Sequence, residues 1–463
     1  MHAPYRMKQF MLLIGDILCF GIGFLLGISI RNLELPAVAT IEKHGVLFLM
    51  LFFLWIVINF INGLYDLDRL PDPKRLYRRM AEACVMSFVV GILFFYLIPE
   101  ARITPKTILL LNVLFGYACS AIWRRFFHRI VGTKTLRTNV IIVGYTPEAK
   151  EIVNVISQFP EKGYSVAAII DPERTIKGSD FPGIDVYHTI QTIRPSITNY
   201  HVQLVVIAPH IRHDETALRE LYELLFWPVQ IIDLPSFYET ITGRIPPSTF
   251  SEGWFLDHLK NREQPIYDKI RTFVDYLAGV LIGSVMIVLF PIIALAIKIG
   301  SPGPIFFKQK RIGKFGKIFN LYKFRSMYAL SPDGSAEMEG AEFAKKDDKR
   351  ITPMGSIIRK FRIDEWPQAL NLLRRDITLI GPRPERPEIV SQLQSMMPYY
   401  ALRHTVRPGL TGWALIHQNY TDTIETSLTK LQYDLFYIKN RSFLLDLSIA
   451  LRTVNVVVRM MGQ

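Results

Sequence analysis

Residues 276–297 read YLAGVLIGSVMIVLFPIIALAI, a run of 22 residues without a charged side chain and with a proline, Pro291, in its second half. An apolar helix of this length can cross the hydrocarbon core of a bilayer. Proline removes one backbone donor and kinks a helix, which is tolerated at membrane depth where neighbouring groups compensate. The run therefore predicts a membrane helix that is broken at Pro291.

Positive charges flank this run on both sides. Lys260, Arg262, Lys269 and Arg271 precede it, and Lys298, Lys308, Lys310, Arg311, Lys314 and Lys317 follow it. Because lysine and arginine favour the cytoplasmic side of a membrane, both ends of the helix are expected there. A re-entrant helix over about residues 270–299, which enters and leaves on one face, satisfies both constraints. The alternative is a simple fifth span, which would move the following basic segment across the membrane.

Four further apolar segments precede this helix, at Met11–Ile30, Val46–Ile61, Ala83–Ile98 and Ile108–Trp123. They predict transmembrane helices, since a helix satisfies its own backbone in lipid. The loop between the second and third segments carries Arg69, Lys74, Arg75, Arg78 and Arg79, so both ends of this four-helix unit are expected in the cytoplasm. The first segment has no cleavage site after it and is expected to be retained.

The composition narrows the class of protein. Half of the 463 residues are hydrophobic, which favours membrane and soluble parts in series, and the formal charge is +13. Such a charge suits nucleic acid, anionic lipid or phosphorylated substrates. Cys19, Cys84 and Cys119 all lie inside apolar runs, without a CxxC pattern or a Cys/His cluster. This excludes a cysteine zinc site and a disulfide framework.

From about Asn139 the pattern changes to short β-branched runs that alternate with amphipathic helices. The runs and helices are Val140–Val143, Pro147–Gln158, Val166–Ile170, Val202–Ile207, Asp214–Leu225 and Val229–Ile232. Such alternation predicts a Rossmann-like parallel sheet with crossover helices. Gly144 keeps only the first glycine of a dinucleotide fingerprint, and Asp171 ends the second strand, where an acid could bind ribose. A bound nucleotide and a cofactor-free scaffold both remain open, and Thr240–Trp254 is expected to be the linker that follows.

The densest candidate chemistry lies between Lys308 and Gly412. Its cations are Lys308, Lys310, Arg311, Lys323, Arg325, Arg350, Arg359, Arg362, Arg374, Arg375, Arg383, Arg386 and Arg407. A basic run is often only a solvated or lipid-facing surface. Here, however, several cations lie in glycine and proline turns such as GPRP (381–384) and RPGLTG (407–412), which could aim a guanidinium at a phosphate. Aromatic residues for base stacking are sparse, so nucleic acid is not expected as a partner.

Within this segment Asp364 and Glu365 stand next to each other on a helix expected from Gly355 to Leu373, interrupted by Pro367. Neighbouring residues on a helix point about 100° apart, so the two carboxylates are expected to differ in role. One could attack phosphorus while the other holds a divalent cation. The alternative is that both are ion-paired with Arg359, Lys360 or Arg362 on the helix surface.

Six motifs in one order carry a family resemblance: SPGPIFFKQKRIG (301–313), YKFRSM (322–327), DKRIT (348–352), RIDEWPQ (362–368), LIGPRPE (379–385) and RHTVRPGLTGW (403–413). With them, residues 265–463 resemble the monotopic phosphoglycosyl transferases, the bacterial sugar transferases that prime exopolysaccharide, capsule and O-antigen synthesis. Four spans and an α/β module upstream resemble the large members of this family, whose amino-terminal parts are accessory.

The resemblance implies specific roles for these residues. Asp364 would be the nucleophile that takes the sugar phosphate, Glu365 would help to coordinate magnesium, and Lys323 would assist catalysis. Lys323, Arg359 and Arg383 match family positions associated with the active site and would bind phosphate oxygens. Arg325, Arg350 and Arg407 lie in the same motifs and are assigned to substrate binding as well.

The sequence also departs from the family pattern. Phe290 precedes Pro291 where many relatives carry serine, Leu415 stands where glutamine is usual, and residues 375–378 read RDIT in place of GDMS. None of these changes touches Asp364 or Glu365. The tail Phe443–Met461 has apolar residues at helical spacing, and core packing and interfacial membrane binding fit it equally well.

The sequence thus predicts a membrane protein with three domains. These are a four-helix transmembrane bundle (1–131), a Rossmann-like cytoplasmic α/β domain with its linker (132–262) and a mostly helical monotopic catalytic domain with the re-entrant helix (263–463). The expected enzyme lies in the bacterial inner membrane, with its catalytic domain facing the cytoplasm. It would move a sugar 1-phosphate from a UDP-sugar to undecaprenyl phosphate and release UMP through a covalent Asp364 intermediate. It would require Mg²⁺ and could act as a homodimer. The alternative function is a membrane-tethered nucleotide-sensing scaffold without catalysis.

Overall fold

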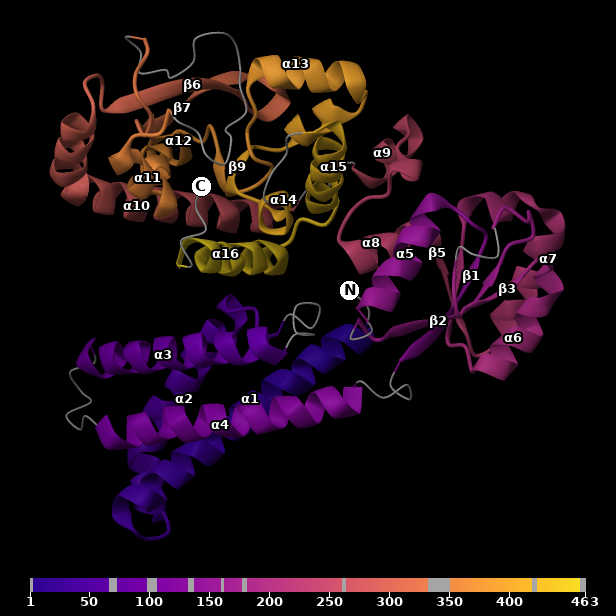
Figure 1. Ribbon diagram of the computed structural model, residues 1–463, viewed down its shortest axis with the longest axis horizontal. Coiled ribbons are helices and arrows are strands. Elements are labelled where there is room, and N and C mark those ends of the chain that lie inside the picture. The colour runs from indigo at the N-terminus through magenta and orange to yellow at the C-terminus, as the bar shows by residue number, and fades with distance from the viewer. Residues whose placement is uncertain are drawn as a thin grey trace. The chain divides into compact units, whose positions relative to one another are not determined.

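A computed structural model of the chain describes residues 3–65, 73–97, 106–131, 137–159, 162–176, 181–259, 264–331, 350–418 and 423–458 (Figure 1). The chain divides into two compact units, residues 1–242 and 243–463. Residues 243–259, in large part the expected linker, pack by their contacts with the second unit, where Ile245 and Phe255 join a buried cluster with Trp413. The three-domain division of the sequence stays a prediction, and Lys260 and Arg262 lie outside the described residues.

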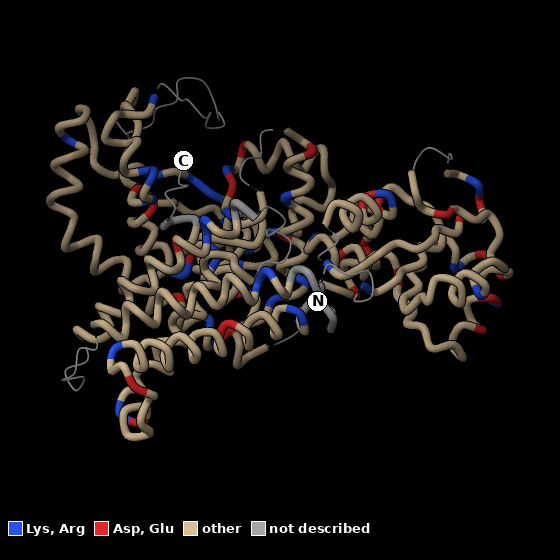
Figure 2. Tube along the Cα trace, turned by 60° about the horizontal axis from the view of Figure 1, so that its bottom comes forward, with Lys and Arg blue, Asp and Glu red and all other residues tan. Residues whose placement is uncertain are grey.

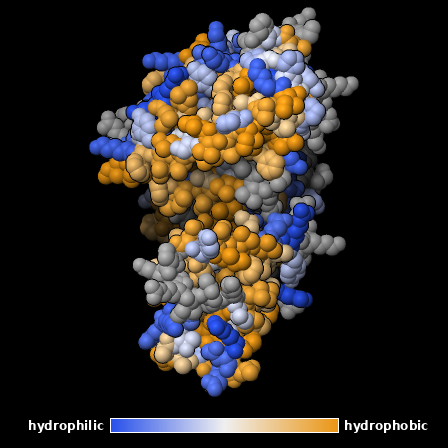
Figure 3. All heavy atoms as spheres, turned by 90° about the vertical axis from the view of Figure 1, so that its left-hand side faces the viewer, coloured by the Kyte–Doolittle hydropathy of each residue, from blue (hydrophilic) through white to orange (hydrophobic). Residues whose placement is uncertain are grey.

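The first unit begins with four long helices, α1 (Ala3–Asn32), α2 (Val38–Ile61), α3 (Pro73–Leu97) and α4 (Lys106–Val131). Each contains one of the expected apolar segments almost entirely, and each is long and apolar enough to cross a membrane. With α10 (Pro265–Gly300), five such helices are found among the described residues, and Figure 2 shows few charges along them. Large apolar side chains are exposed over much of the face seen in Figure 3. The chain is a membrane protein.

A buried ion pair lies among these four helices. Nη2 of Arg124 in α4 lies 2.5 Å from Oδ2 of Asp16 in α1, and both side chains are almost fully buried. Asp16 also accepts hydrogen bonds from Ser120 at 2.6 Å and from Tyr65 at 2.9 Å. Because a buried charge is costly unless it is paired and hydrogen-bonded, this network specifies how α1 meets α4.

The second part of this unit is a parallel five-stranded sheet in the order β3-β2-β1-β4-β5. Its strands are β1 (Thr138–Val143), β2 (Tyr164–Ile170), β3 (Asp185–Tyr187), β4 (Leu204–Ile207) and β5 (Gln230–Asp233), and its helices are α5 (Pro147–Gln158), α6 (Ile193–Tyr200), α7 (Glu215–Glu223) and α8 (Leu234–Thr242). β4 is buried along its length and β1 from Val140 to Val143, as valine- and isoleucine-rich runs predict. The expected parallel sheet with crossover helices is confirmed.

Gly144 and Asp171 both have close contacts within the chain. Gly144 has φ +90°, and a Cβ there would lie 2.7 Å from Cβ of Ala208 and 2.9 Å from the His210 ring. The carboxylate of Asp171 accepts hydrogen bonds from the hydroxyl of Thr175 and from the backbone N–H of Ile176. Close packing therefore explains the glycine, and capping of a loop explains the acid, without a ligand.

The second unit contains helices around three short sheets. Its elements are α9 (Glu252–His258), α10, β6 (Phe306–Ile312), β7 (Ile318–Phe324), α11 (Pro353–Lys360), α12 (Ala369–Leu373), β8 (Thr378–Ile380), α13 (Pro387–Met396), β9 (Gly409–Thr411), α14 (Trp413–His417), α15 (Ile424–Lys439) and α16 (Phe443–Val458). β6 and β7 form an antiparallel hairpin, and β8 and β9 pair in parallel.

Both arms of α10 are attached to the rest of this unit, and Figure 1 shows a bend in the helix. In the first arm, Asp275 accepts the backbone N–H of Leu379 at 2.7 Å. Next to Pro291, the ring of Phe290 stacks on Phe306 of β6. In the second arm, Arg325 donates to the carbonyl of Ile297, and it also donates to those of Ser301 and Pro302 just after the helix. The helical hydrogen bonding runs through Pro291 from Pro265 to Gly300, so the proline lies within one helix.

One expected helix is absent. The sequence predicts a helix from Gly355 to Leu373, but the structure has α11, then the 3-10 helix η9 (Ile363–Gln368), then α12. The interruption occurs at Arg362, which has φ +56°. A left-handed residue ends a helix because its backbone cannot continue the α-helical hydrogen bonds, so the prediction of one helix was wrong here.

Candidate active site

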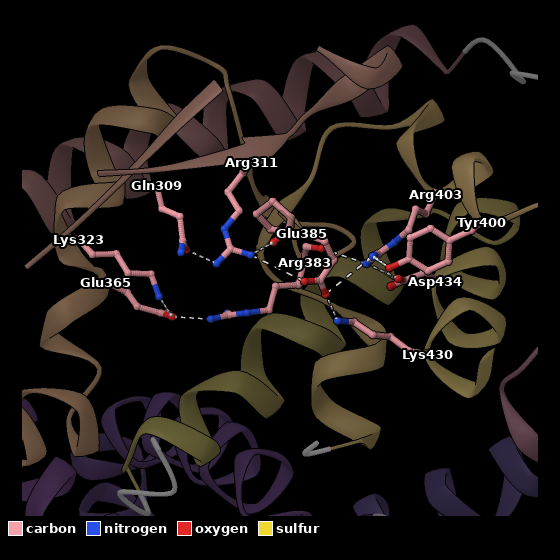
Figure 4. A network of polar contacts seen from close by, with 11 residues as sticks. Gln309, Arg311, Lys323, Glu365, Arg383, Glu385, Tyr400, Arg403, Lys430 and Asp434 are labelled. Carbon is pink, nitrogen blue, oxygen red and sulfur yellow. Dashed lines mark hydrogen bonds and ion pairs between the residues drawn. The ribbon is translucent and has the colours of Figure 1, made fainter. Parts of the chain in front are cut away.

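Glu365 lies at the centre of a cluster of cations. Its Oε1 is 2.7 Å from Nη2 of Arg383 and 3.4 Å from Nζ of Lys323, and its Oε2 is 3.4 Å from Nη1 of Arg362 (Figure 4 shows the first two). Burial alone would raise the pKa of Glu365, but Arg383, Lys323 and Arg362 outweigh it and hold the pKa well below its usual range. Glu365 is therefore a permanent carboxylate that fixes the surrounding cations.

Asp364 has a different environment, although it is the adjacent residue. Its side chain is 9% exposed, and among the described residues it has no hydrogen-bond or ion-pair partner. Burial raises the pKa of Asp364 to about 6, with Glu365 acting in the same direction, while Lys323, Arg359 and Arg383 lower it. The carboxylate of Asp364 is thus available for chemistry, whereas that of Glu365 is already engaged.

Local backbone geometry separates the two carboxylates. Thr352 caps α11 by accepting the N–H of Gly355 at 2.8 Å, and α11 ends before Arg362, which turns the chain into η9. Lys323 comes from β7, so the hairpin supplies a cation opposite η9. Burial lowers the pKa of Lys323, while Glu365 and Asp364 oppose that shift. Three separate segments therefore converge on this pair of acids.

A second buried network holds the turn that carries Arg383 (Figure 4). Nη2 of Arg403 donates to the carbonyl of Arg383 at 2.9 Å and lies 2.7 Å from Oδ2 of Asp434. Glu385, two residues after Arg383, pairs with Lys430 and Arg311. Burial would raise the pKa of Glu385, but Lys430, Arg403 and Arg311 lower it to about 2.

Sequence reasoning did not assign roles to Glu385, Arg403, Lys430 or Asp434. Glu385 and Arg403 lie inside two of the quoted motifs, which was the only available signal for them. Lys430 and Asp434 lie on α15, an ordinary amphipathic helix by its pattern, and nothing in the sequence distinguished them.

The remaining predicted cations lie in different places. Arg325 is buried and donates to the carbonyls at the C-terminal end of α10, so it lies outside the Glu365 cluster. Arg359, in α11, acts electrostatically on Asp364. Arg350 precedes α11, and its carbonyl accepts the N–H of Tyr328 at 2.9 Å. Arg407 lies before β9, and its charged neighbours are Arg375, Arg271, Asp275 and Asp268.

The two carboxylates can be compared with what a magnesium ion requires. Mg²⁺ is commonly bound by one or two carboxylates together with phosphate oxygens of the substrate. No group of three acidic, histidine or cysteine side chains that could hold a metal is found among the described residues. Oε2 of Glu365 has only the longer contact with Arg362, and Asp364 is unpartnered. The residues fit a site that substrate phosphates complete.

Comparisons with known proteins show the family of the chain. The family model described as bacterial sugar transferase matches residues 266–460. An uncharacterized sugar transferase EpsL of Bacillus subtilis (strain 168) is 42% identical over 176 residues, which cover 37% of this chain and 78% of that protein. The chain belongs to the bacterial sugar transferase family. It is a large phosphoglycosyl transferase of that family, since the matched segment follows four membrane helices and an α/β sheet.

Two further relatives have names that state a reaction. A UDP-N-acetylgalactosamine-undecaprenyl-phosphate N-acetylgalactosaminephosphotransferase of Aeromonas hydrophila is 38% identical, with 50% of this chain and 53% of that protein covered. A UDP-glucose:undecaprenyl-phosphate glucose-1-phosphate transferase of Klebsiella pneumoniae is 28% identical, with 80% and 79% covered. The chain spans about half or less of several other relatives, including 34% of a Xanthomonas campestris pv. campestris protein and 42% of an Escherichia coli (strain K12) protein.

A second family model, described as CoA-binding domain, matches residues 60–235. In this region Ala208 and His210 lie close to Gly144, and the Asp171 carboxylate caps its own loop. The proposed sugar-phosphate transfer does not involve residues of this sheet.

Proposed function

We propose that the chain transfers a sugar 1-phosphate from a UDP-sugar to undecaprenyl phosphate and so initiates synthesis of a surface polysaccharide. The observation that carries the proposal is the contrast between Asp364, buried and unpartnered, and Glu365, held by three cations. A nucleophile must be free to attack, while a positioning acid must be fixed. The reactions named for the relatives supply the substrate class.

In the proposed first step, a carboxylate oxygen of Asp364 attacks the phosphorus that bears the sugar. The bond between this phosphorus and the bridging oxygen of the diphosphate breaks, and UMP leaves with that oxygen. The phospho-sugar is then attached to Asp364 as an acyl phosphate. Lys323, Arg359 and Arg383 surround the reacting carboxylate and would bind the phosphate oxygens, because fixed cations stabilise the charge of a transferring phosphoryl group.

In the second step, an oxygen of undecaprenyl phosphate attacks the same phosphorus and releases the Asp364 carboxylate. Glu365 would hold Mg²⁺ together with the diphosphate, and the ion would neutralise charge on the departing UMP. Since Glu365 also holds Arg383 and Lys323, it would keep these cations around the phosphorus during both steps.

The membrane arrangement is part of the proposal. Both arms of α10 contact the same polar unit, through Asp275 in the first arm and the carbonyls of Ile297 and Ser301 in the second. A helix that crossed the bilayer would carry its two ends to opposite sides, so these contacts favour a re-entrant helix bent near Pro291. With basic residues at both ends, the catalytic unit would face the cytoplasm of the bacterial inner membrane, where UDP-sugars are found.

Intact-protein mass spectrometry tests the covalent step. The purified chain is mixed with Mg²⁺ and each of several UDP-sugars, without acceptor lipid. A mass increase equal to one sugar phosphate is expected with the true donor, and Asp364→Asn, which keeps the shape of the side chain, is expected to remove it. Adding undecaprenyl phosphate should discharge the adduct.

Two other results would change the proposal. Lipid-dependent release of UMP without any adduct would indicate direct transfer and exclude Asp364 as nucleophile. Neither adduct nor UMP release, in protein that unfolds cooperatively on heating, would argue against catalysis and favour the scaffold alternative.

A further inference from the structure

The first turns of α10 and of α16 form one surface, far in the fold from α13 (Figure 1). Tyr267 of α10 donates to Asp446 of α16 at 2.7 Å, and Arg271 lies 4.0 Å from the same carboxylate. Asp446 and Ile449 therefore bury one face of α16 against the unit. Exposed apolar side chains lie on the outer faces of both helices and on the nearby 314–318 turn: Ile266, Ile270, Phe273, Phe315, Ile318, Phe443, Leu444 and Leu447.

Four cations gather at the edge of this surface: Lys314, Arg375, Arg407 and Arg441. Arg375 donates to Thr272 of α10 at 3.4 Å, and the Thr378 N–H donates to the carbonyl of Pro408 at 2.8 Å, which brings the segments before β8 and β9 together. None of the four forms an ion pair with a carboxylate among the described residues. Burial lowers the pKa of Lys314, Arg407 and Arg441 lower it further, and Asp268 opposes the shift.

This cluster is distinct from the one around Glu365. The cations that act on Asp364 and Glu365 are Lys323, Arg359, Arg362 and Arg383, which come from β7, α11, the residue before η9 and the 381–384 turn. Asp268 acts on Lys314, Asp268 and Asp275 act on Arg407, and Asp446 acts on Arg441. With Arg271, the cations outnumber these carboxylates, and like charges in excess disfavour one another unless an anion binds between them. The second cluster is thus a candidate anion site with no part in the proposed sugar transfer.

The apolar surroundings identify the anion. A soluble phosphate needs only cations, whereas a phospholipid needs cations for its headgroup and an apolar face for its acyl chains. Leu444, 71% exposed, and Phe443 continue the apolar surface of the membrane helix α10 along α16. Nucleic acid does not explain this arrangement, because it would leave both apolar faces in water.

We propose that the α10–α16 surface binds acidic phospholipids, with headgroup phosphates on Lys314, Arg375, Arg407 and Arg441 and acyl chains against the apolar side chains of both helices. The surface would hold α16 in the membrane interface. Core packing and interfacial membrane binding, the two interpretations of the C-terminal tail, then both apply, since one face of α16 packs in the core and the other meets lipid.

A fluorescent label that reports contact with lipid tests the proposal independently of catalysis. In the full chain with Cys19, Cys84 and Cys119 replaced by alanine, Leu444→Cys is labelled and the protein is placed in nanodiscs of phosphatidylcholine, with or without phosphatidylglycerol. Brominated acyl chains are expected to quench the label strongly only when phosphatidylglycerol is present. The control label, at Ser395→Cys on α13, is exposed on the opposite side of the unit and is expected to stay unquenched.

Charge neutralisation gives the second arm of the test. Each of Lys314→Gln and Arg441→Gln is expected to lower the ratio of quenched to unquenched label about five-fold, given roughly 1 kcal/mol per cation near an acidic surface. Equal quenching at Leu444 and Ser395, or quenching that is independent of phosphatidylglycerol and of these two substitutions, would overturn the proposal. Loss of the phosphatidylglycerol effect on adding soluble inorganic phosphate at constant ionic strength would assign the cluster to free anions instead.

Discussion

Asp364 and Glu365 are adjacent carboxylic acids, yet their surroundings give them different ionisation behaviour and different proposed roles. Three cations keep Glu365 ionised, while burial brings the pKa of Asp364 to about 6. An acid whose charged form is partly destabilised is a better nucleophile than one locked in ion pairs, because less interaction is lost when it attacks.

The rate of adduct formation should therefore depend on the ionisation of Asp364. The folded pKa is raised from 3.8 to about 6, so the attacking carboxylate is lost as pH falls through about 6. We expect the rate to rise with pH up to a midpoint near that value and then to level off, measured by quenched mass spectrometry. Lys323→Met should move the midpoint upward, since Lys323 lowers this pKa. A midpoint that Lys323→Met leaves unchanged would contradict the assignment.

Arg403 is expected to position Arg383 without touching substrate. Arg403→Met leaves Asp434 buried and unpaired and should destabilise the unit by about 3–5 kcal/mol. The double variant Arg403→Met, Asp434→Leu should recover most of that stability in thermal unfolding. Its adduct formation should still be about 10- to 100-fold slower, because the carbonyl of Arg383 has lost its donor. Full recovery of both properties would show that Arg403 is only structural.

At the scale of helices and strands, polar pairs determine which faces pack together, whereas apolar surfaces alone allow several arrangements. Asp16 and Arg124 join α1 to α4, and Asp275 joins α10 to the backbone of β8. Apolar side chains gain little by choosing one another over lipid, so such pairs decide which helix faces meet.

Removing one member of the α1–α4 pair should be costly. Arg124→Met leaves the Asp16 carboxyl buried without its cation, and a loss of about 3–5 kcal/mol is expected in detergent unfolding experiments. The matched control is Arg125→Met, an exposed cation at the next position of the same helix. Equal effects of the two substitutions would mean that the pair has no special role.

The turn after β1 permits a similar comparison within the sheet. Gly144→Ala meets both a positive φ and a Cβ contact of 2.7 Å, whereas Gly183→Ala meets a positive φ with nothing within 4 Å. Gly144→Ala should lower the melting temperature more, by an amount that reflects about 1–3 kcal/mol of overpacking. Equal effects would mean that only the strain of a positive φ lowers the stability at both positions. The space beside Gly144 could then accept a ligand.

The sequence predicted these elements unevenly. The apolar runs and the alternating strands follow simple periodicities, and the helices and the parallel sheet form where expected. The break at Arg362 was missed because a left-handed arginine has no sequence signal. Glycine and proline turns indicated cations around a phosphate, and Arg383 lies there. They could not show that Arg325 instead binds the carbonyls at the end of α10.

At the scale of the whole chain, the predicted chemistry is contained in one part. Among the described residues, every ion-pair partner of Glu365 and Glu385 lies between residues 311 and 430. We therefore expect a fragment of residues 243–463 in detergent to form the sugar-phosphate adduct at a rate within a few-fold of the full chain. A fragment that unfolds cooperatively but forms no adduct would show that the first unit contributes to the reaction.

The attachment of α10 has a consequence for how the chain is made. Arg271, at the start of that helix, donates to the carbonyl of Ile380, which lies 109 residues later in the sequence. While the ribosome adds those residues, the apolar helix α10, with the charged Arg271 near its start, has already been synthesised without its final partners. Closure of so long a loop is slow and leaves the helix exposed to aggregation in the meantime. Early contact of the nascent helix with the membrane would protect it, so insertion should precede folding of the polar part that later holds it.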